Sequence, residues 1–225
     1  MIDGIKGIYF DFGNVIGYPK PDIDRRYLYL NWDGISSIMK NPDISRHLIK
    51  GKGLKEVEES FTKNVYEIFI KHEKTDLIDP QSYKLLIYEL PSLFNCQINE
   101  QLVDNILECV NTMKYLEIYP DISHILDKLK NKGYCLSMIS NMMLPGKLLI
   151  QKLSENDILP YFNTVTISSD IGFIKPHKEI FSRTLEKDSL KPEEVIFVGD
   201  SYSQDIIGAK STGMKTIWLK SGYES

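Results

Sequence analysis

The chain has 225 residues, of which 42% are hydrophobic and 26% are charged. These fractions are ordinary for globular proteins and exclude collagen-like, mucin-like and wholly disordered chains. The length fits one large domain or a core with a smaller insert, because single hydrophobic cores stop growing at about 250 to 300 residues. Lysine and arginine total 27 against 31 acidic residues, the net charge is −4, and the basic residues are spread along the chain. We expect no nucleic-acid partner, since nucleic acids bind concentrated basic faces.

The cysteines and the hydropathy pattern indicate a reducing compartment. Cys96, Cys109 and Cys135 show no Cys-x-x-Cys spacing, which favours reduced thiols over a zinc site or a redox pair. The N-terminal segment lacks the pattern of a secretory signal. No segment approaches the roughly 18 to 20 apolar residues that span a bilayer. We therefore expect a cytoplasmic protein without membrane contact.

The first predicted element is a buried strand over 7–10, a short apolar run that ends at Asp11. Beyond it, no comparable strand pattern recurs until about residue 118. Apolar residues at helical spacing predict helices over 54–71 and 101–113, and a third helix is expected over 82–90. We expect this interval to be all-helical.

From residue 118 onward, short apolar runs alternate with amphipathic stretches. Pro120 and Gly133 flank a predicted helix over 121–132 and are typical of a helix start and end. The elements that follow are a strand at 134–139, a helix at 147–156, a strand at 164–168, a helix at 177–187, a strand at 194–198, a helix at 203–212 and a strand at 215–219. This alternation predicts an α/β fold with a parallel sheet.

The two patterns divide the chain unequally. Residues 1–17 and 118–225 form the predicted α/β core, and residues 18–117 form a predicted helical insert. The insert has roughly 100 residues, which is within the size range of a domain.

Polar residues follow the predicted strands where ligands bind in open parallel sheets, beyond the carboxyl ends of the strands. Asp11 follows the first strand, and Ser140-Asn141 follows the strand at 134–139. Lys175-Pro176 comes after the next strand. Gly199-Asp200-Ser201, with Asp205 shortly afterwards, follows the strand at 194–198.

This set of side chains suits phosphoryl transfer. The carboxylates of Asp11 and Asp200 offer the oxygen ligands that Mg²⁺ prefers. Ser140, Asn141 and Lys175 could hold phosphate oxygens and neutralise charge in the transition state. A carboxylate nucleophile would form an aspartyl phosphate and split hydrolysis into two easier displacements.

In this order, the segments resemble the four motifs of the haloacid dehalogenase superfamily of hydrolases. The matching segments are Asp11-Phe12-Gly13-Asn14-Val15, Ser140-Asn141, Lys175-Pro176, and Gly199-Asp200-Ser201 followed by Asp205, Gly208 and Ala209. The resemblance covers the predicted core, and the interval 18–117 is placed like the helical cap of that family. It implies a doubly wound, Rossmann-like parallel sheet with an inserted all-helical cap domain.

The resemblance also implies residue roles. The catalytic residues would be Asp11, as the nucleophile, and Lys175, which would orient both the nucleophile and the phosphate. Phosphate would be bound by Ser140, Asn141 and Lys175. The Mg²⁺ cofactor would be held by Asp11, the backbone carbonyl of Gly13, Asp200 and Asp205, the last acting nearby or through water.

Gly13 departs from the family pattern. Phosphatases of this superfamily usually carry there a second aspartate, which protonates the leaving group, and general acid–base catalysis typically contributes about 10² to 10⁴ in rate. We expect substrates with leaving groups that need little protonation, such as sugar-1-phosphates, acyl phosphates or aryl phosphates. Some family members with a similar Asp-x-Gly-Asn-Val motif are sugar-phosphate phosphatases. Alternatively, a replacement acid comes from the loop or cap, where Asp22 and Asp24 are the nearest candidates.

The sequence thus predicts a Mg²⁺-dependent phosphomonoester hydrolase for a small phosphorylated metabolite, with a sugar phosphate as first choice, acting as a monomer or homodimer. One alternative is a 2-haloacid dehalogenase, which also lacks the second aspartate. Gly199-Asp200 argues against it, because such dehalogenases work without metal and generally lack this pair. The other is a catalytically weakened protein that binds phosphate or a partner. We expect His177 to cap the following helix and Met142-Met143 to pack in the core.

Overall fold

The computed structural model describes residues 2–21, 37, 40–47, 55, 56, 59, 71, 77 and 99–220. Within the predicted helix over 54–71, the described residues at 55, 56, 59 and 71 are helical. The predicted helix over 82–90 lies outside the described residues. So do Asp22 and Asp24, the candidate replacement acids. The division into a core and a cap therefore stays a prediction over most of 18–117.

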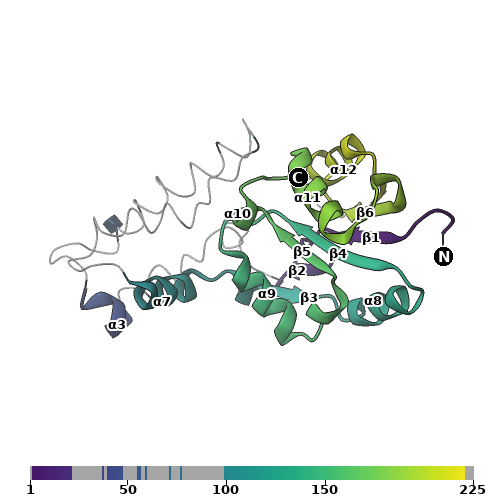
Figure 1. Ribbon diagram of the computed structural model, residues 1–225. Coiled ribbons are helices and arrows are strands. Elements are labelled where there is room, and N and C mark those ends of the chain that lie inside the picture. Colours follow the sequence, from purple (N-terminus) through teal and green to yellow (C-terminus); the bar gives the residue numbers. More distant parts are fainter. Residues whose placement is uncertain are drawn as a thin grey trace.

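Five parallel strands form the central sheet in the order β5-β4-β1-β6-β7 (Figure 1). The strands are β1 (Gly7–Phe10), β4 (Cys135–Ser140), β5 (Thr164–Ile167), β6 (Val195–Gly199) and β7 (Lys215–Trp218). Each was predicted to within one residue at either end. Their apolar runs are short and continuous, as expected for strands that are covered on both faces.

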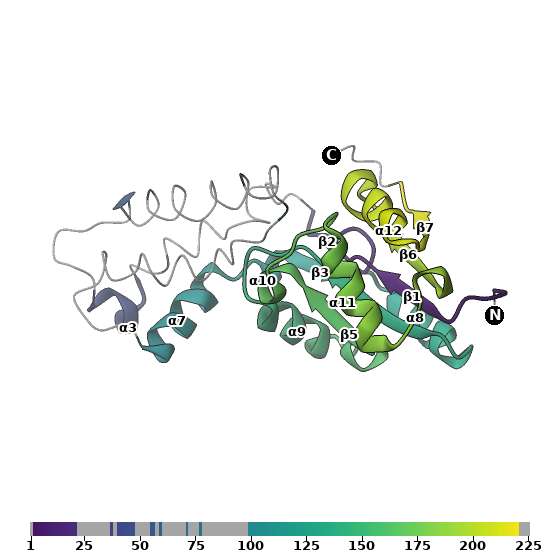
Figure 2. The same ribbon diagram turned by 45° about the horizontal axis from the view of Figure 1, so that its top comes forward.

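Helices cover both faces of this sheet (Figure 2). They are α8 (Ile122–Asn131), α9 (Gly146–Glu155), α11 (Lys178–Asp188) and α12 (Ile207–Thr212). One hydrophobic cluster contains Ile8 and Phe10 of β1 with residues of α8 and α9. A second contains Tyr9 with residues of α11 and α12. Because alternate strand residues point to opposite faces, the sheet is doubly wound, and the predicted Rossmann-like fold is confirmed.

A short antiparallel ribbon lies between the core and the inserted interval. It pairs β2 (Gly17–Pro19) with β3 (Leu116–Ile118), so that Gly17 faces Ile118 and Pro19 faces Leu116. The expectation that residues 18–117 are all-helical is therefore wrong at both edges of the interval. Each strand has three residues and one contains proline, so neither shows the alternation that identifies a strand in a sequence.

The remaining described elements are short, apart from α7 (Glu100–Val110), which confirms the helix predicted over 101–113 but ends earlier. They are α3 (Pro42–Ser45), α10 (Ser168–Ile171), and the 3₁₀ turns η3 (Met113–Tyr115), η4 (Leu159–Tyr161) and η5 (Pro192–Glu194). The helix predicted over 203–212 begins as a π-helical turn, η6 (Tyr202–Ile206), before α12. A π-helical turn has no distinct hydrophobic period, so the sequence predicted an ordinary helix.

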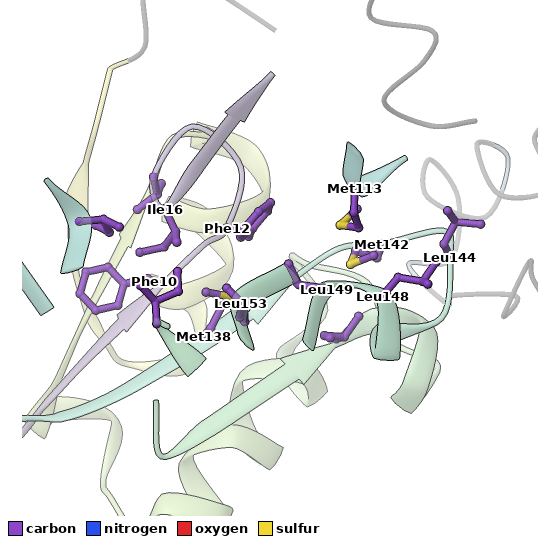
Figure 3. Close-up of a cluster of buried hydrophobic side chains, with 14 of the residues drawn as sticks. Phe10, Phe12, Ile16, Met113, Met138, Met142, Leu144, Leu148, Leu149 and Leu153 are labelled. Carbon is purple, nitrogen blue, oxygen red and sulfur yellow. The ribbon is translucent and has the colours of Figure 1, made fainter. Parts of the chain in front are cut away.

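The larger hydrophobic cluster reaches the carboxyl ends of the strands. Figure 3 shows members from the loop after β1 (Phe12 and Ile16), from β4 (Met138) and from α9 (Leu149 and Leu153). Met142 and Met143 are buried in the same cluster, so their predicted core packing is confirmed. This packing fixes the loops that carry the polar residues described next.

Two further sequence predictions bear on the described part of the chain. No helix among the described residues is long and apolar enough to cross a membrane. Among the described residues, Cys109 and Cys135 are not joined in a disulfide, and each is half-buried.

Candidate active site

A cavity of about 280 Å³ opens at the carboxyl ends of the parallel strands. Its polar lining includes Asp11, Gly13, Ser140, Asn141, Lys175 and Asp200. Register explains the convergence, because Phe10 pairs with Met138 on one side and with Val198 on the other. The residues that follow these strands therefore meet at one edge of the sheet.

Lys175 lies between two carboxylates beneath the cavity. Its Nζ donates to Asp11 Oδ1 at 2.6 Å and to Asp205 Oδ1 at 2.7 Å. The Lys175 side chain is 2% exposed and that of Asp205 is 1% exposed. Asp205 also accepts a hydrogen bond from the Ser201 backbone N–H at 3.0 Å. A buried ion pair of this kind tolerates little loss of either partner, because an uncompensated buried charge is costly.

The electrostatics of the site favour another cation. Burial raises the pKa of Asp11 to about 7; Lys175 opposes this rise, and the charges of Asp205 and Asp200 add to it. Burial lowers the pKa of Lys175, but attraction to Asp11 and then to Asp205 outweighs burial and holds that pKa above its usual value. Lys175 is thus charged at neutral pH, and its single positive charge is shared between the Asp11 and Asp205 carboxyl groups.

The three carboxyl groups form a compact oxygen cluster. One oxygen atom from each of Asp11, Asp200 and Asp205 lies within 4.8 Å of the others. Oxygen ligands are those that Mg²⁺ prefers in proteins. The residues present therefore fit a divalent cation, as the sequence predicts for Asp11, Asp200 and Asp205.

Asn14 orients one of these carboxylates. Its Nδ2 donates to Asp200 Oδ2 at 2.8 Å, which joins the loop after β1 to the loop after β6. The Asn14 backbone has a φ of 53°, in the left-handed region that asparagine adopts more readily than most residues. Sequence reasoning did not assign Asn14 a role, although it quoted the residue within the first motif.

Asn141 binds the backbone of Lys175 rather than an open position. Its Oδ1 accepts from the Lys175 N–H at 2.8 Å, and its Nδ2 donates to the Lys175 carbonyl at 3.2 Å. The same Nδ2 donates to Gln204 Oε1 at 3.3 Å. The amide of Asn141 thus positions Lys175, the predicted catalytic lysine, and direct phosphate binding by Asn141 stays a prediction. Ser140, at the end of β4, lines the cavity as predicted.

Gly13 leaves open space beside the predicted nucleophile. A Cβ on residue 13 would lie 3.5 Å from Asp11 Oδ2, which is ordinary van der Waals contact. The position thus admits a side chain, yet supplies no carboxyl group. Whether its backbone carbonyl binds a metal stays a prediction.

The rest of the cavity lining is largely apolar and was not predicted as part of a site. It includes Thr112, Met113, Leu116, Met142, Met143 and Leu144. Thr112 and Met113 precede β3 and Leu116 is its first residue, and all three lie outside the core motifs. His177, by contrast, behaves as predicted: its Nδ1 accepts from the Glu179 N–H at 3.1 Å at the start of α11.

Comparisons with known proteins agree with this geometry. A family model described as haloacid dehalogenase-like hydrolase matches residues 52–219. The chain is 39% identical over 110 residues to glyceraldehyde 3-phosphate phosphatase of Pyrococcus furiosus, a stretch covering 48% of this chain and 44% of that protein. It is 28% identical over 135 residues to pyrophosphatase PpaX of Bacillus mycoides, covering 56% and 61%. The chain belongs to the haloacid dehalogenase-like hydrolase family.

Solved structures show the same fold over nearly the whole chain. A phosphatase of this family from Thermococcus onnurineus has 26% sequence identity and a TM-score of 0.60, covering 98% of this chain and 89% of that one. A 2-haloacid dehalogenase from Pseudomonas syringae pv. Tomato has a TM-score of 0.65 at 18% identity, covering 98% and 90%; this likeness concerns the fold alone. The chain spans about half the length of the curated relatives that it matches, with 44% and 46% for two of them.

Proposed function

We propose that the protein is a Mg²⁺-dependent phosphomonoester hydrolase that acts on a small phosphorylated metabolite through an aspartyl phosphate on Asp11. One observation carries this proposal. Asp11 lines the cavity at the end of β1, bound to a buried lysine at 2.6 Å and clustered with two further carboxyl groups. The names of the curated relatives, glyceraldehyde 3-phosphate phosphatase and pyrophosphatase, support hydrolysis of a phosphate substrate.

The residues divide the work of two displacements. Lys175 binds Asp11 Oδ1, so the other oxygen, Oδ2, is the atom that attacks phosphorus. The new Oδ2–P bond forms as the bond from phosphorus to the leaving oxygen breaks, and that oxygen takes a proton from solvent water, because residue 13 supplies none. Water then attacks phosphorus as the Oδ2–P bond breaks, which releases inorganic phosphate, returns a proton to the solvent and regenerates the Asp11 carboxylate. Bound Mg²⁺, held by Asp11, Asp200 and Asp205, would offset the repulsion between the phosphate dianion and the carboxylates.

Gly13 narrows the expected substrates. With no carboxyl group at this position, the leaving oxygen receives no proton from the residue that usually supplies it. Substrates with stable leaving groups depend least on such a proton, which favours sugar-1-phosphates, acyl phosphates and aryl phosphates. A sugar phosphate is our first choice. The cytoplasmic location and a monomeric or homodimeric state stay predictions from the sequence.

Two other functions carry less support. A 2-haloacid dehalogenase shares the fold, but the Asp200 and Asp205 carboxylates beside Asp11 give a reason for metal-dependent chemistry instead. A protein that only binds phosphate would not require the tightly held Asp11–Lys175 pair.

The deciding experiment measures phosphate release from a panel of phosphate esters, with Mg²⁺ and with a chelator. We expect Mg²⁺-dependent turnover that is lost in Asp11→Asn, whereas Asp121→Asn, an exposed aspartate at the start of α8, retains wild-type rates. Turnover that survives Asp11→Asn would overturn the phosphoenzyme. Halide release from a 2-haloacid without metal would establish the dehalogenase instead.

A further inference from the structure

The end of β7 is tied to the loop that carries Asp200. The Trp218 Nε1–H donates to the Asp200 backbone carbonyl at 2.9 Å. One residue further on, the Leu219 N–H donates to the Gly199 carbonyl at 2.9 Å. The consecutive carbonyl groups of Gly199 and Asp200 are therefore held by Leu219 and Trp218, at the end of β7.

The indole of Trp218 has a second contact that fixes its direction. The Tyr202 ring lies against it, with 5.2 Å between the ring centroids and an angle of 51° between the planes. Tyr202 is the first residue of the π-helical turn η6, two residues after Asp200. Both rings are about half exposed, at 54% for Tyr202 and 46% for Trp218. Trp218 therefore contributes little to the hydrophobic core, and its clearest polar role is the bond to Asp200.

Asp200 is held by hydrogen bonds at its side chain and at its backbone. Asn14 binds its carboxylate Oδ2 at 2.8 Å, and Trp218 binds its backbone carbonyl at 2.9 Å. With the backbone and one carboxylate oxygen fixed, the carboxyl group keeps its place in the cluster with Asp11 and Asp205. Polar sites are more effective when their ligands are held in position by surrounding hydrogen bonds of this kind.

We propose that Trp218 is a positioning residue for the cation site: its indole N–H holds the Asp200 backbone so that the carboxylate faces the cation. This inference rests on the proposed function, because the cation concerned is Mg²⁺. Trp218 acts through Asp200 and touches neither substrate nor metal. The Tyr202–Trp218 pair on the surface thus contributes to the affinity of the cation site for Mg²⁺.

The test variant lacks the indole N–H donor of Trp218 but keeps an aromatic ring at this position. Trp218→Phe in the full chain removes the donor and retains an aromatic face for Tyr202. Mg²⁺ binding is measured by titration calorimetry without substrate, and we expect affinity to fall about tenfold, the size of one hydrogen bond. The rate at saturating Mg²⁺ should stay near the wild-type value, because the substitution lowers occupancy of the metal site rather than the chemistry. Ile217→Ala, at a position 45% exposed on the same strand, is the matched control and should bind Mg²⁺ as the wild type does.

Fluorescence gives an independent readout. The chain has two tryptophans, and the difference between wild-type and Trp218→Phe emission isolates Trp218. We expect this difference signal to change on Mg²⁺ addition, with the midpoint found by calorimetry.

The outcomes separate the inference from the function on which it rests. Mg²⁺ affinity within twofold of wild type in Trp218→Phe overturns the positioning role, while Mg²⁺-dependent hydrolysis in the same variant leaves the proposed function standing. An equal loss of affinity in Ile217→Ala indicates general damage to β7 and also overturns the role. Absence of Mg²⁺ binding by the wild type overturns both the role and the metal dependence.

Discussion

Gly199 leaves free the space that the side chain of Asp205 fills. A Cβ on residue 199 would overlap the Asp205 side chain. Asp205 in turn accepts hydrogen bonds from Lys175 Nζ at 2.7 Å and from the Ser201 N–H at 3.0 Å. The glycine that ends β6 is thus required by the buried lysine, through the carboxylate between them.

Gly199→Ala should therefore lower both stability and activity. Forcing one extra carbon into a packed site costs about 1 to 3 kcal/mol, and displacing Asp205 removes one of the two partners that hold Lys175. We expect a lower free energy of unfolding in urea and a loss in kcat/KM on the order of 100-fold. Gly13→Ala, where an added Cβ meets only ordinary contact, should leave stability nearly unchanged. Wild-type kcat/KM in Gly199→Ala would contradict this link.

Gly13→Asp should restore a general acid. A Cβ on residue 13 meets only ordinary van der Waals contact with Asp11, and such an acid helps most when the leaving group is a poor one. We expect turnover of an alkyl phosphate to rise by about 10-fold or more, toward the contribution typical of general acids. An aryl phosphate should change little.

The measurement for Gly13→Asp is the slope of log kcat/KM against the leaving-group pKa. The slope should be steep in the wild type and shallower in Gly13→Asp, with Gly13→Asn as the uncharged control. A flat wild-type slope would instead indicate that another residue already supplies the proton.

Asp188 should stabilise the fold without affecting the chemistry. As the last residue of α11, it accepts hydrogen bonds from Ser137 Oγ of β4 and Thr164 Oγ1 of β5, each at 2.6 Å. Hydrogen bonds to charged groups contribute about 1.5 to 3 kcal/mol each, so losing both in Asp188→Ala should lower the free energy of unfolding by about 3 to 6 kcal/mol. Glu186→Ala, exposed on the same helix, should change it by less than about 0.5 kcal/mol. Asp188 does not line the cavity. A change in kcat/KM under conditions where the variant is fully folded would therefore count against this assignment.

Cys135 should be an unreactive thiol at physiological pH. Burial, and next the charge of Asp188, raise its pKa to about 11. Only the thiolate is nucleophilic, and at pH 8 roughly one thiol in a thousand would be ionised, against about a quarter for an ordinary cysteine. Iodoacetamide labelling followed by mass spectrometry should be slow in the native protein and about 100-fold faster in denaturant. Native labelling should accelerate as the pH rises toward 11, and equal native and denatured rates at pH 8 would refute the shift.

The parallel sheet and the main members of the site were predictable because their signals are local. Three of the strands are short apolar runs that lead directly into polar residues of the site, at Asp11, Asn141 and Asp200. Parallel order then brings these strand ends together. The capping role of His177 follows from equally local geometry.

Other features depend on partners that are distant in sequence. Asn14 meets Asp200 across 186 residues and Trp218 reaches the Asp200 carbonyl across 18, and nothing near either residue signals its partner. Asn141 was predicted to bind phosphate, whereas its amide hydrogen bonds go to the Lys175 backbone and to Gln204. The sequence shows Gly199 only as part of the last motif, and the packed structure relates it to Asp205.

The ribbon of β2 and β3 places both ends of the inserted interval at one point of the core. The backbones are joined there, with the Lys20 N–H donating to the Tyr115 carbonyl at 2.8 Å. The chain that leaves the core after β2 returns beside its own point of departure. Because the two ends of the interval stay paired, a change in its length need not shift the register of any strand in the five-stranded sheet, whereas changes at Thr112 and Met113 would reach the cavity that they line.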